Sequence, residues 1–271
     1  MVFHPMRQRL LRLVCWCHWL DVFGWCLHSY FQLFMIGDRL MLNQILAKED
    51  TIHISKLTGK LEHFRAIGTN TKTNPFCIIQ NNPSDKVKRA IGRFVNKDYK
   101  NNNHMKNIVK ICNKNSLTTF ALWTKRKDII KGFFNHHSKP NNLILVYSNP
   151  KVNSIMTVPP KYFDKVFNNV LKDSFISEQN CTGQKCSDCL QCYKKTGETV
   201  IVEAVKRFKG KLKTICEACY SHKGIEFRKA LYAPLERNSR LLKTELADIQ
   251  IPTIMDLYFR FDQHGELLDN D

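Results

Sequence analysis

The sequence predicts an α/β protein, built either as a partial βα barrel or as an open parallel sheet. Residues 143–148 form a continuous apolar run between Asn142 and Asn149, which is the pattern of a parallel strand buried on both faces. From Thr51 onward, short apolar segments of this kind alternate with amphipathic helical patterns. Strands that alternate with helices are joined by right-handed crossovers, which place the strands parallel in one sheet.

The other elements follow from the same two patterns. Further strands are predicted at residues 119–124, 199–205 and 257–261. Helices are predicted at residues 105–113, 128–135 and 227–246. We expect Pro234 to interrupt the last helix, because proline removes a backbone hydrogen bond from a helix interior.

The chain divides into an α/β metal-binding domain, residues 51–271, and a hydrophobic, basic N-terminal extension, residues 1–50. Within the domain, residues 83–103 carry basic side chains three or four positions apart, which predicts a solvated linker helix or a helix that contacts phosphate groups. In the extension, Arg12 and Asp21 interrupt the apolar residues. No charge-free run reaches the length of a membrane span, so membrane association is the less favoured alternative to an interfacial helix, a core helix or an unstructured extension.

The balance of charge bears on the partners of the protein. A net charge of +18 favours nucleic acid, phosphorylated ligands or an anionic membrane surface, although a lysine-rich surface without a specific partner explains it equally well. The cysteine count of eleven is odd, and paired Cys-x2-Cys units favour a reducing compartment, so a cytoplasmic location is expected. The sequence contains no Walker loop, dinucleotide-binding glycine pattern or nucleophile elbow, and nothing in it identifies a substrate.

Six cysteines lie close together in the C-terminal part of the chain. They are Cys181, Cys186, Cys189, Cys192, Cys216 and Cys219. The first four have the spacing Cys-x4-Cys-x2-Cys-x2-Cys, and the last two form a separate Cys-x2-Cys. Gaps of two residues let neighbouring thiolates converge on one metal centre, so the pattern predicts a metal or cluster site.

Two sets of ligands are compatible with this spacing. In the first, Cys186, Cys189, Cys216 and Cys219 form a zinc ribbon, which is a closed structural site. Together with the positive charge, a zinc ribbon indicates a nucleic-acid-binding protein without enzymatic activity. This set leaves Cys181 without a role, and Cys192 likewise.

In the second set, the four cysteines of residues 181–192 hold a [4Fe–4S] cluster by themselves. Cys216 and Cys219 then need a third ligand, for which Cys77 is the natural candidate and the predicted buried Cys112 a weaker one. Three cysteines leave one iron of a [4Fe–4S] cluster open. Radical S-adenosylmethionine enzymes bind their cofactor at such an iron, and a strand that ends in a Gly-Glu turn holds the methionine amino group.

The chain also resembles a known family in several segments. The matching residues are 54–61 (ISKLTGKL), 74–77 (NPFC), 120–125 (FALWTK), 142–150 (NLILVYSNP), 181–193, 216–220 (CEACY), 258–261 (YFRF) and 265–267 (GEL). Together they cover most of residues 51–271 and resemble the phage gene product 88 family and its relatives in Firmicutes phages, which are functionally uncharacterised. The resemblance makes the expected location the cytoplasm of a host cell.

The order of these segments differs from the order in the family. In the family, the Asn-Pro-Phe-Cys turn runs directly into Cys-x2-Cys-Tyr and the Gly-Glu strand, whereas here residues 104–206 precede residues 207–271. Two segments have thus exchanged places, which preserves a fold when the new junctions lie in surface loops. Tyr220 follows the last cysteine, whereas radical S-adenosylmethionine enzymes commonly place an aromatic residue before it.

The resemblance implies a phage-type iron–sulfur protein that is similar to radical S-adenosylmethionine enzymes. Its cofactors would be a [4Fe–4S] cluster on Cys77, Cys216 and Cys219, and S-adenosylmethionine near Gly265 and Glu266. The cysteines of residues 181–192 would hold a second, auxiliary centre.

Two pairs of residues at predicted strand ends are further candidates. Arg260 and Asp262 either belong to the site or form a structural salt bridge. Lys125 could face a cofactor, whereas Trp123 is explained more simply by core packing.

Overall fold

The computed structural model of the chain describes residues 46, 49–54, 61–74, 76–77, 98–171, 177–205, 214–227, 229–262 and 264–269. The predicted N-terminal extension and the predicted basic linker lie largely outside these residues. Their predicted roles therefore stay predictions.

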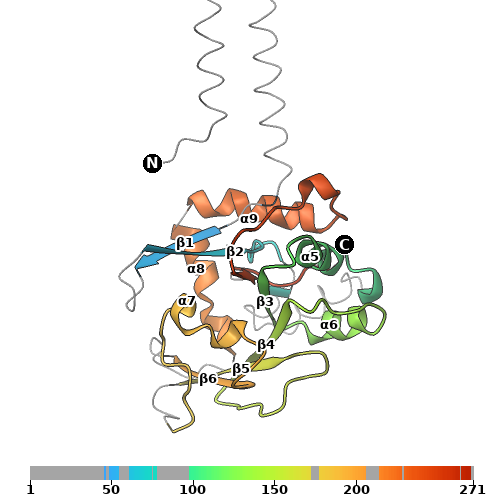
Figure 1. The fold of residues 1–271 in the computed structure, drawn as a ribbon. Helices are drawn as coiled ribbons and strands as arrows, with labels where there is room; N and C mark the ends of the chain where they lie inside the picture. Colours follow the sequence, from blue (N-terminus) through green and yellow to red (C-terminus); the bar gives the residue numbers. More distant parts are fainter. Residues whose placement is uncertain are drawn as a thin grey trace, which may run out of the picture. The chain divides into compact units, whose positions relative to one another are not determined.

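Seven strands form one sheet, in the order β1-β2-β7-β3-β4-β5-β6 (Figure 1). Their bounds are β1 Glu49–Ile54, β2 Leu61–Ile67, β3 Thr119–Thr124, β4 Leu143–Val152, β5 Lys165–Leu171, β6 Val200–Val205 and β7 Tyr258–Phe261. β1 pairs antiparallel with β2, whereas every other pair is parallel. Six parallel strands with helices confirm the predicted α/β class.

The last of these strands along the chain lies in the interior of the sheet. β7 pairs on one side with β2 and on the other side with β3, so that Arg260 stands opposite both Ala66 and Ala121. If residues 214–269 were placed between β2 and residue 98, the six parallel strands would lie in the sheet in the same order as along the chain. The sheet thus has the strand order that an exchange of two segments would produce, and the family resemblance itself stays a prediction.

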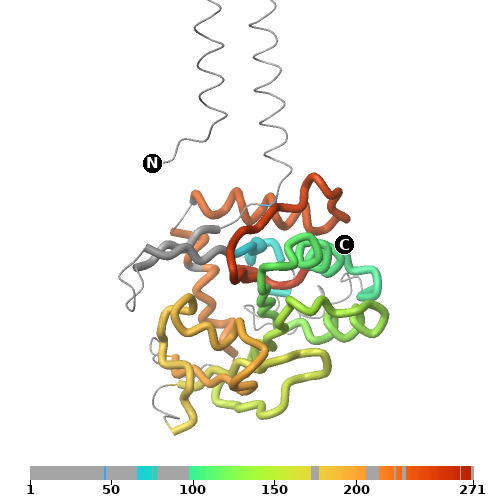
Figure 2. The backbone as a smooth tube through the Cα atoms, viewed as in Figure 1, coloured from blue at the N-terminus to red at the C-terminus, as the bar shows by residue number. Residues whose placement is uncertain are grey.

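The C-terminal segment lies beside the start of helix α5, Asn103–Lys114 (Figure 2). The Asn102 side chain donates to the carbonyl oxygen of Leu268 over 2.7 Å, and the amide of Leu268 donates to Nδ1 of His104 over 3.0 Å. Asn102 also caps α5, because its side chain accepts a hydrogen bond from the amide of Met105. The segment that follows β7 therefore ends next to the helix that leads into β3.

The helices include the three that were predicted, whereas α7 and α8 were not predicted. Their bounds are α5 Asn103–Lys114, α6 Lys127–Phe134, α7 Cys186–Cys189, α8 Tyr220–Phe227 and α9 Lys229–Leu242. Pro234 lies inside α9 and does not interrupt it, and α8 precedes it where no helix was predicted. Within the part of the chain that the structure describes, no helix has the length and apolar character needed to cross a membrane.

The two faces of the sheet bury different groups, because side chains alternate along each strand. In β3, Phe120 and Leu122 belong to the large core shared with α5 and α6. Ala121 points to the opposite face, where it packs in a second cluster with Cys192 and Tyr193. Figure 1 shows α5 and α6 on one side of the central strands and the segment of α7 on the other. The segment that carries four of the cysteines is thus the cover of one sheet face.

A pH dependence of stability follows from His104, which is 2% exposed. Burial lowers the pKa of His104 from 6.5 to about 3. Between these values the unfolded chain binds a proton that the folded chain does not, so we expect stability to fall as the pH decreases from 6.5 towards 3. The contribution is about 1.4 kcal/mol per pH unit.

Urea unfolding at a series of pH values measures this slope. His104→Gln retains an acceptor for the amide of Leu268, and it should reduce the slope by one proton. The same substitution at the exposed His136 is the control and should leave the slope unchanged. An unaltered slope in His104→Gln would contradict the assignment.

Candidate functional site

Cys77, Cys216 and Cys219 lie within range of electrostatic interaction, and we refer to them as the three-cysteine group. Cys77 lies in the segment after β2, Cys216 lies in the 3-10 helix η4 (Ile215–Ala218), and Cys219 directly precedes α8. Burial raises the pKa of Cys77; Glu266 raises it further and Lys125 opposes the shift, while Cys219 and Cys216 also raise it. Residues far apart in the sequence are therefore close electrostatic neighbours.

A partly buried cation accompanies this group. Lys125, the residue after β3, has its Nζ 3.9 Å from Oε2 of Glu266. Burial alone would lower the pKa of Lys125, but Cys216, Glu266, Cys77 and Cys219 together raise it. In turn, burial raises the pKa of Cys216 to about 11, although Lys125 lowers it. The three thiols thus interact with a positive charge that favours negative groups at this point.

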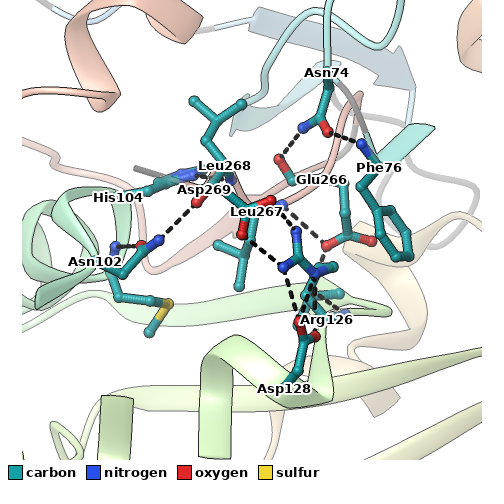
Figure 3. Close-up of polar contacts among 12 residues, drawn as sticks. Asn74, Phe76, Asn102, His104, Arg126, Asp128, Glu266, Leu267, Leu268 and Asp269 are labelled. Atoms are coloured by element: carbon teal, nitrogen blue, oxygen red, sulfur yellow. Dashed lines mark hydrogen bonds and ion pairs between the residues drawn. The ribbon is translucent and has the colours of Figure 1, made fainter. Parts of the chain in front are cut away.

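Glu266 joins the loops that follow three neighbouring strands. It is 1% exposed, and its carboxylate accepts hydrogen bonds from the backbone amide of Lys125 over 2.8 Å and from the hydroxyl of Thr124. Its backbone carbonyl accepts from the side chain of Asn74 over 3.0 Å (Figure 3), and its amide donates to Oγ1 of Thr69. The Glu266 side chain therefore fixes the end of β3 beside the Cys77 loop.

Gly265 permits the close contact between two of these loops. Its φ is +106°, and a Cβ atom there would lie 1.9 Å from Oγ1 of Thr69. The amide of Thr69 also donates to the carbonyl of His264 over 2.7 Å, which continues the parallel pairing of β2 and β7 beyond the strands. A glycine at this position thus lets the loop after β7 reach the Cys77 loop.

The cysteines of residues 181–192 form a separate four-cysteine group. Cys186 is the first residue of α7 and Cys189 the last, and Cys192 lies in the 3-10 helix η3 (Gln191–Tyr193). The backbone of Cys181 forms an isolated parallel β-bridge with Glu203 of β6. Burial raises the pKa of Cys192; Cys186 raises it further and Arg260 opposes the shift, while Cys181 and Cys189 also raise it. The four thiols are thus electrostatic neighbours of one another.

Both groups border one cavity of about 630 Å³. Its lining contains all four thiols of the four-cysteine group together with Cys216 and Cys219. Trp123, Arg260 and Gly265, from β3, β7 and the loop after β7, also line it. The cavity lies at the carboxyl ends of parallel strands, where α/β proteins commonly bind their ligands.

The arrangement bears on the two predicted ligand sets. The described cysteines are free thiols, and no three His, Cys, Asp or Glu side chains among the described residues are placed to hold a single metal ion. The zinc-ribbon set would place Cys216 and Cys186 on one metal, but their charged neighbours differ. Cys216 interacts with Lys125 and Glu266, whereas Cys186 interacts with Arg260 and Glu203. Cys112, the weaker alternative to Cys77, is fully buried in the helical core.

The sequence-based reasoning missed the residues that position the site. Thr69 and Thr124 bind Glu266, but a threonine near the end of a strand carries no distinctive signal. Asp262 and Arg260 form no salt bridge with each other, because Arg260 instead places its guanidinium over the ring of Trp123 at 4.3 Å. Trp123 packs on Phe167, with 4.6 Å between ring centroids, and it also lines the cavity.

Three comparisons with known proteins found no match. The chain matches no protein-family model, no curated protein and no solved structure.

Proposed function

We propose that this chain is an iron–sulfur protein in which the three-cysteine group holds a [4Fe–4S] cluster with one open iron. The observation that supports the proposal is the position of Cys77 beside Cys216 and Cys219. Cys77 lies far from the other two in the sequence, but β7, which follows them along the chain, pairs with β2, which precedes Cys77. A set of three thiolates suits a cluster that keeps one iron available for a further ligand.

The surroundings of the three thiols fit such a group. A cluster with three thiolates carries net negative charge, and Lys125 supplies a partly buried cation that interacts with all three thiols. Gly265 lines the adjoining cavity without a side chain, so the backbone there is open to a ligand. When bound, the cluster would supply an electron to S-adenosylmethionine chelated at its open iron.

The four-cysteine group would hold a second cluster. It lines the same cavity, and the main chain turns within it at Leu190, whose φ is +54°. This turn directs Cys192 towards the sheet, where it packs beside Ala121. Four thiolates complete the ligands of a cluster, so this centre would have no open iron.

Anaerobic purification with iron, sulfide and zinc analysis tests the proposal. We expect a brown protein that loses about half of its iron in Cys77→Ala and in Cys216→Ala, because each substitution removes a ligand from one cluster only. Cys186→Ala should remove the other half, and Cys112→Ala, the matched control, should remove none.

Two further measurements separate this proposal from its rival. The full-length protein with both centres should cleave S-adenosylmethionine reductively, and Cys77→Ala should abolish this activity while keeping iron in the four-cysteine group. A colourless protein with tightly bound zinc and salt-dependent binding to DNA would overturn the proposal, and it would favour a zinc-ribbon protein that binds nucleic acid.

A further inference from the structure

Arg260 is an unusual residue in the cavity between the two cysteine groups. It lies in β7 between Phe259 and Phe261, which face the helical core, so its own side chain points to the opposite face of the sheet. There it lines the cavity, and its guanidinium lies 4.3 Å from the centre of the Trp123 ring. The aromatic ring holds the planar cation in a defined orientation.

The charge of Arg260 has no carboxylate to balance it. Among the described residues, no aspartate or glutamate forms an ion pair with Arg260, and its buried Nε has no hydrogen-bond partner. Its electrostatic neighbours are Tyr193, Tyr220, Cys186 and Cys192. None of these side chains is an obligate anion in the way that a carboxylate is.

Arg126 shows how this fold satisfies an arginine that has a structural role. Its guanidinium donates to both carboxylate oxygens of Asp269, over 2.9 and 2.7 Å, and also to Asp128. Arg260 is half-buried and has Tyr193 as a hydrogen-bond neighbour. Because no carboxylate of the described residues pairs with it, its charge is available to an anion that enters the cavity.

We propose that the cavity binds a small molecule through an oxyanion, either a carboxylate or a phosphate, held by Arg260. A guanidinium matches the paired oxygens of both groups, and a volume of about 630 Å³ lies in the range of small-ligand sites. Trp123, beneath the guanidinium, and Tyr220 are both in the lining of the cavity, so a ligand with a flat apolar body fits beside the charged end. The proposal does not rest on the proposed iron–sulfur function, although a cluster on Cys186 and Cys192 would add negative charge beside Arg260.

Calorimetric titration of the full-length protein with benzoate and with phenyl phosphate tests this proposal. Benzamide, which has the same ring without the charge, is the neutral comparison. Arg260→Gln should weaken binding of the preferred anion at least tenfold, whereas Arg240→Gln, which removes an exposed arginine from α9, should change it less than twofold. Tighter binding of benzoate identifies a carboxylate site, and tighter binding of phenyl phosphate a phosphate site.

A measurement on the unaltered protein covers the case in which Arg260→Gln does not fold. Phenylglyoxal modifies arginine side chains, and mass spectrometry of the digested protein reports which ones. The preferred anion should slow modification of Arg260 at least threefold, and benzamide should not. The proposal is overturned if neither anion binds, if benzamide binds as tightly as the anions, if Arg260→Gln binds like the unaltered protein, or if the anions leave modification of Arg260 unchanged.

Discussion

Replacement of Arg126 with methionine is expected to lower the free energy of unfolding by about 3–5 kcal/mol. Arg126 is 3% exposed, and its guanidinium bridges Asp269, which is 5% exposed, and Asp128 (Figure 3). It also lies over the rings of Phe76, at 5.1 Å, and Tyr99, at 5.8 Å. Methionine fills a similar space but leaves the carboxylate of Asp269 buried without a partner.

Chemical denaturation measures this loss, and a second ion pair provides the control. Lys139 pairs with Asp164 at 2.7 Å, but both side chains are about one-quarter exposed to solvent. Lys139→Met should therefore cost no more than about 1 kcal/mol. The double variant Arg126→Met with Asp269→Asn should recover part of the loss, because it removes the buried unpaired charge. Equal losses in the two single variants would contradict the role assigned to Arg126.

Gly265→Ala should destabilise the protein by about 2–5 kcal/mol. The left-handed backbone conformation costs an L-residue about 1–2 kcal/mol, and overlap in a packed site costs about 1–3 kcal/mol more. Both apply here, because φ is +106° and the new methyl group would overlap Oγ1 of Thr69. Thr69 cannot retreat easily, because its backbone carbonyl and amide lie almost as close, at 2.6 and 2.8 Å.

Gly197→Ala separates the two contributions. Gly197 also has a positive φ, +84°, but no atom lies within 4 Å of the position of a Cβ there. This variant should therefore lose only the conformational contribution of about 1–2 kcal/mol. Thermal and denaturant unfolding of both variants gives the comparison. If the two glycines respond alike, the contact between the loops after β2 and β7 does not constrain the fold.

The fold was predictable where burial and apolar composition agree. Leu143, Ile144, Leu145 and Val146 are all at most 1% exposed, and their apolar run predicted β4. β5 was not predicted, because its buried residues include Lys165 and two asparagines. The Nζ of Lys165 donates a hydrogen bond to the backbone carbonyl of Glu198 over 2.7 Å, and no local sequence pattern reveals this contact.

The candidate site was predictable in its residues and less so in its construction. The spacing of the cysteines indicated two groups, and Cys77 interacts electrostatically with Cys216 and Cys219. That these three hold one centre stays a prediction. The sequence does not show how the loops of the site approach one another, because their approach depends on β7 entering the sheet between β2 and β3. The bonds from Glu266 to Lys125, Thr124 and Asn74 arise only after that insertion.

The interior position of β7 also has a consequence for folding during translation. The ribosome completes β3, β4, β5 and β6 before β7, so a nascent sheet of these four strands presents the unpaired edge of β3 to its surroundings. An open parallel edge invites pairing with other chains. We infer that the sheet closes only when Tyr258–Phe261 leaves the exit tunnel.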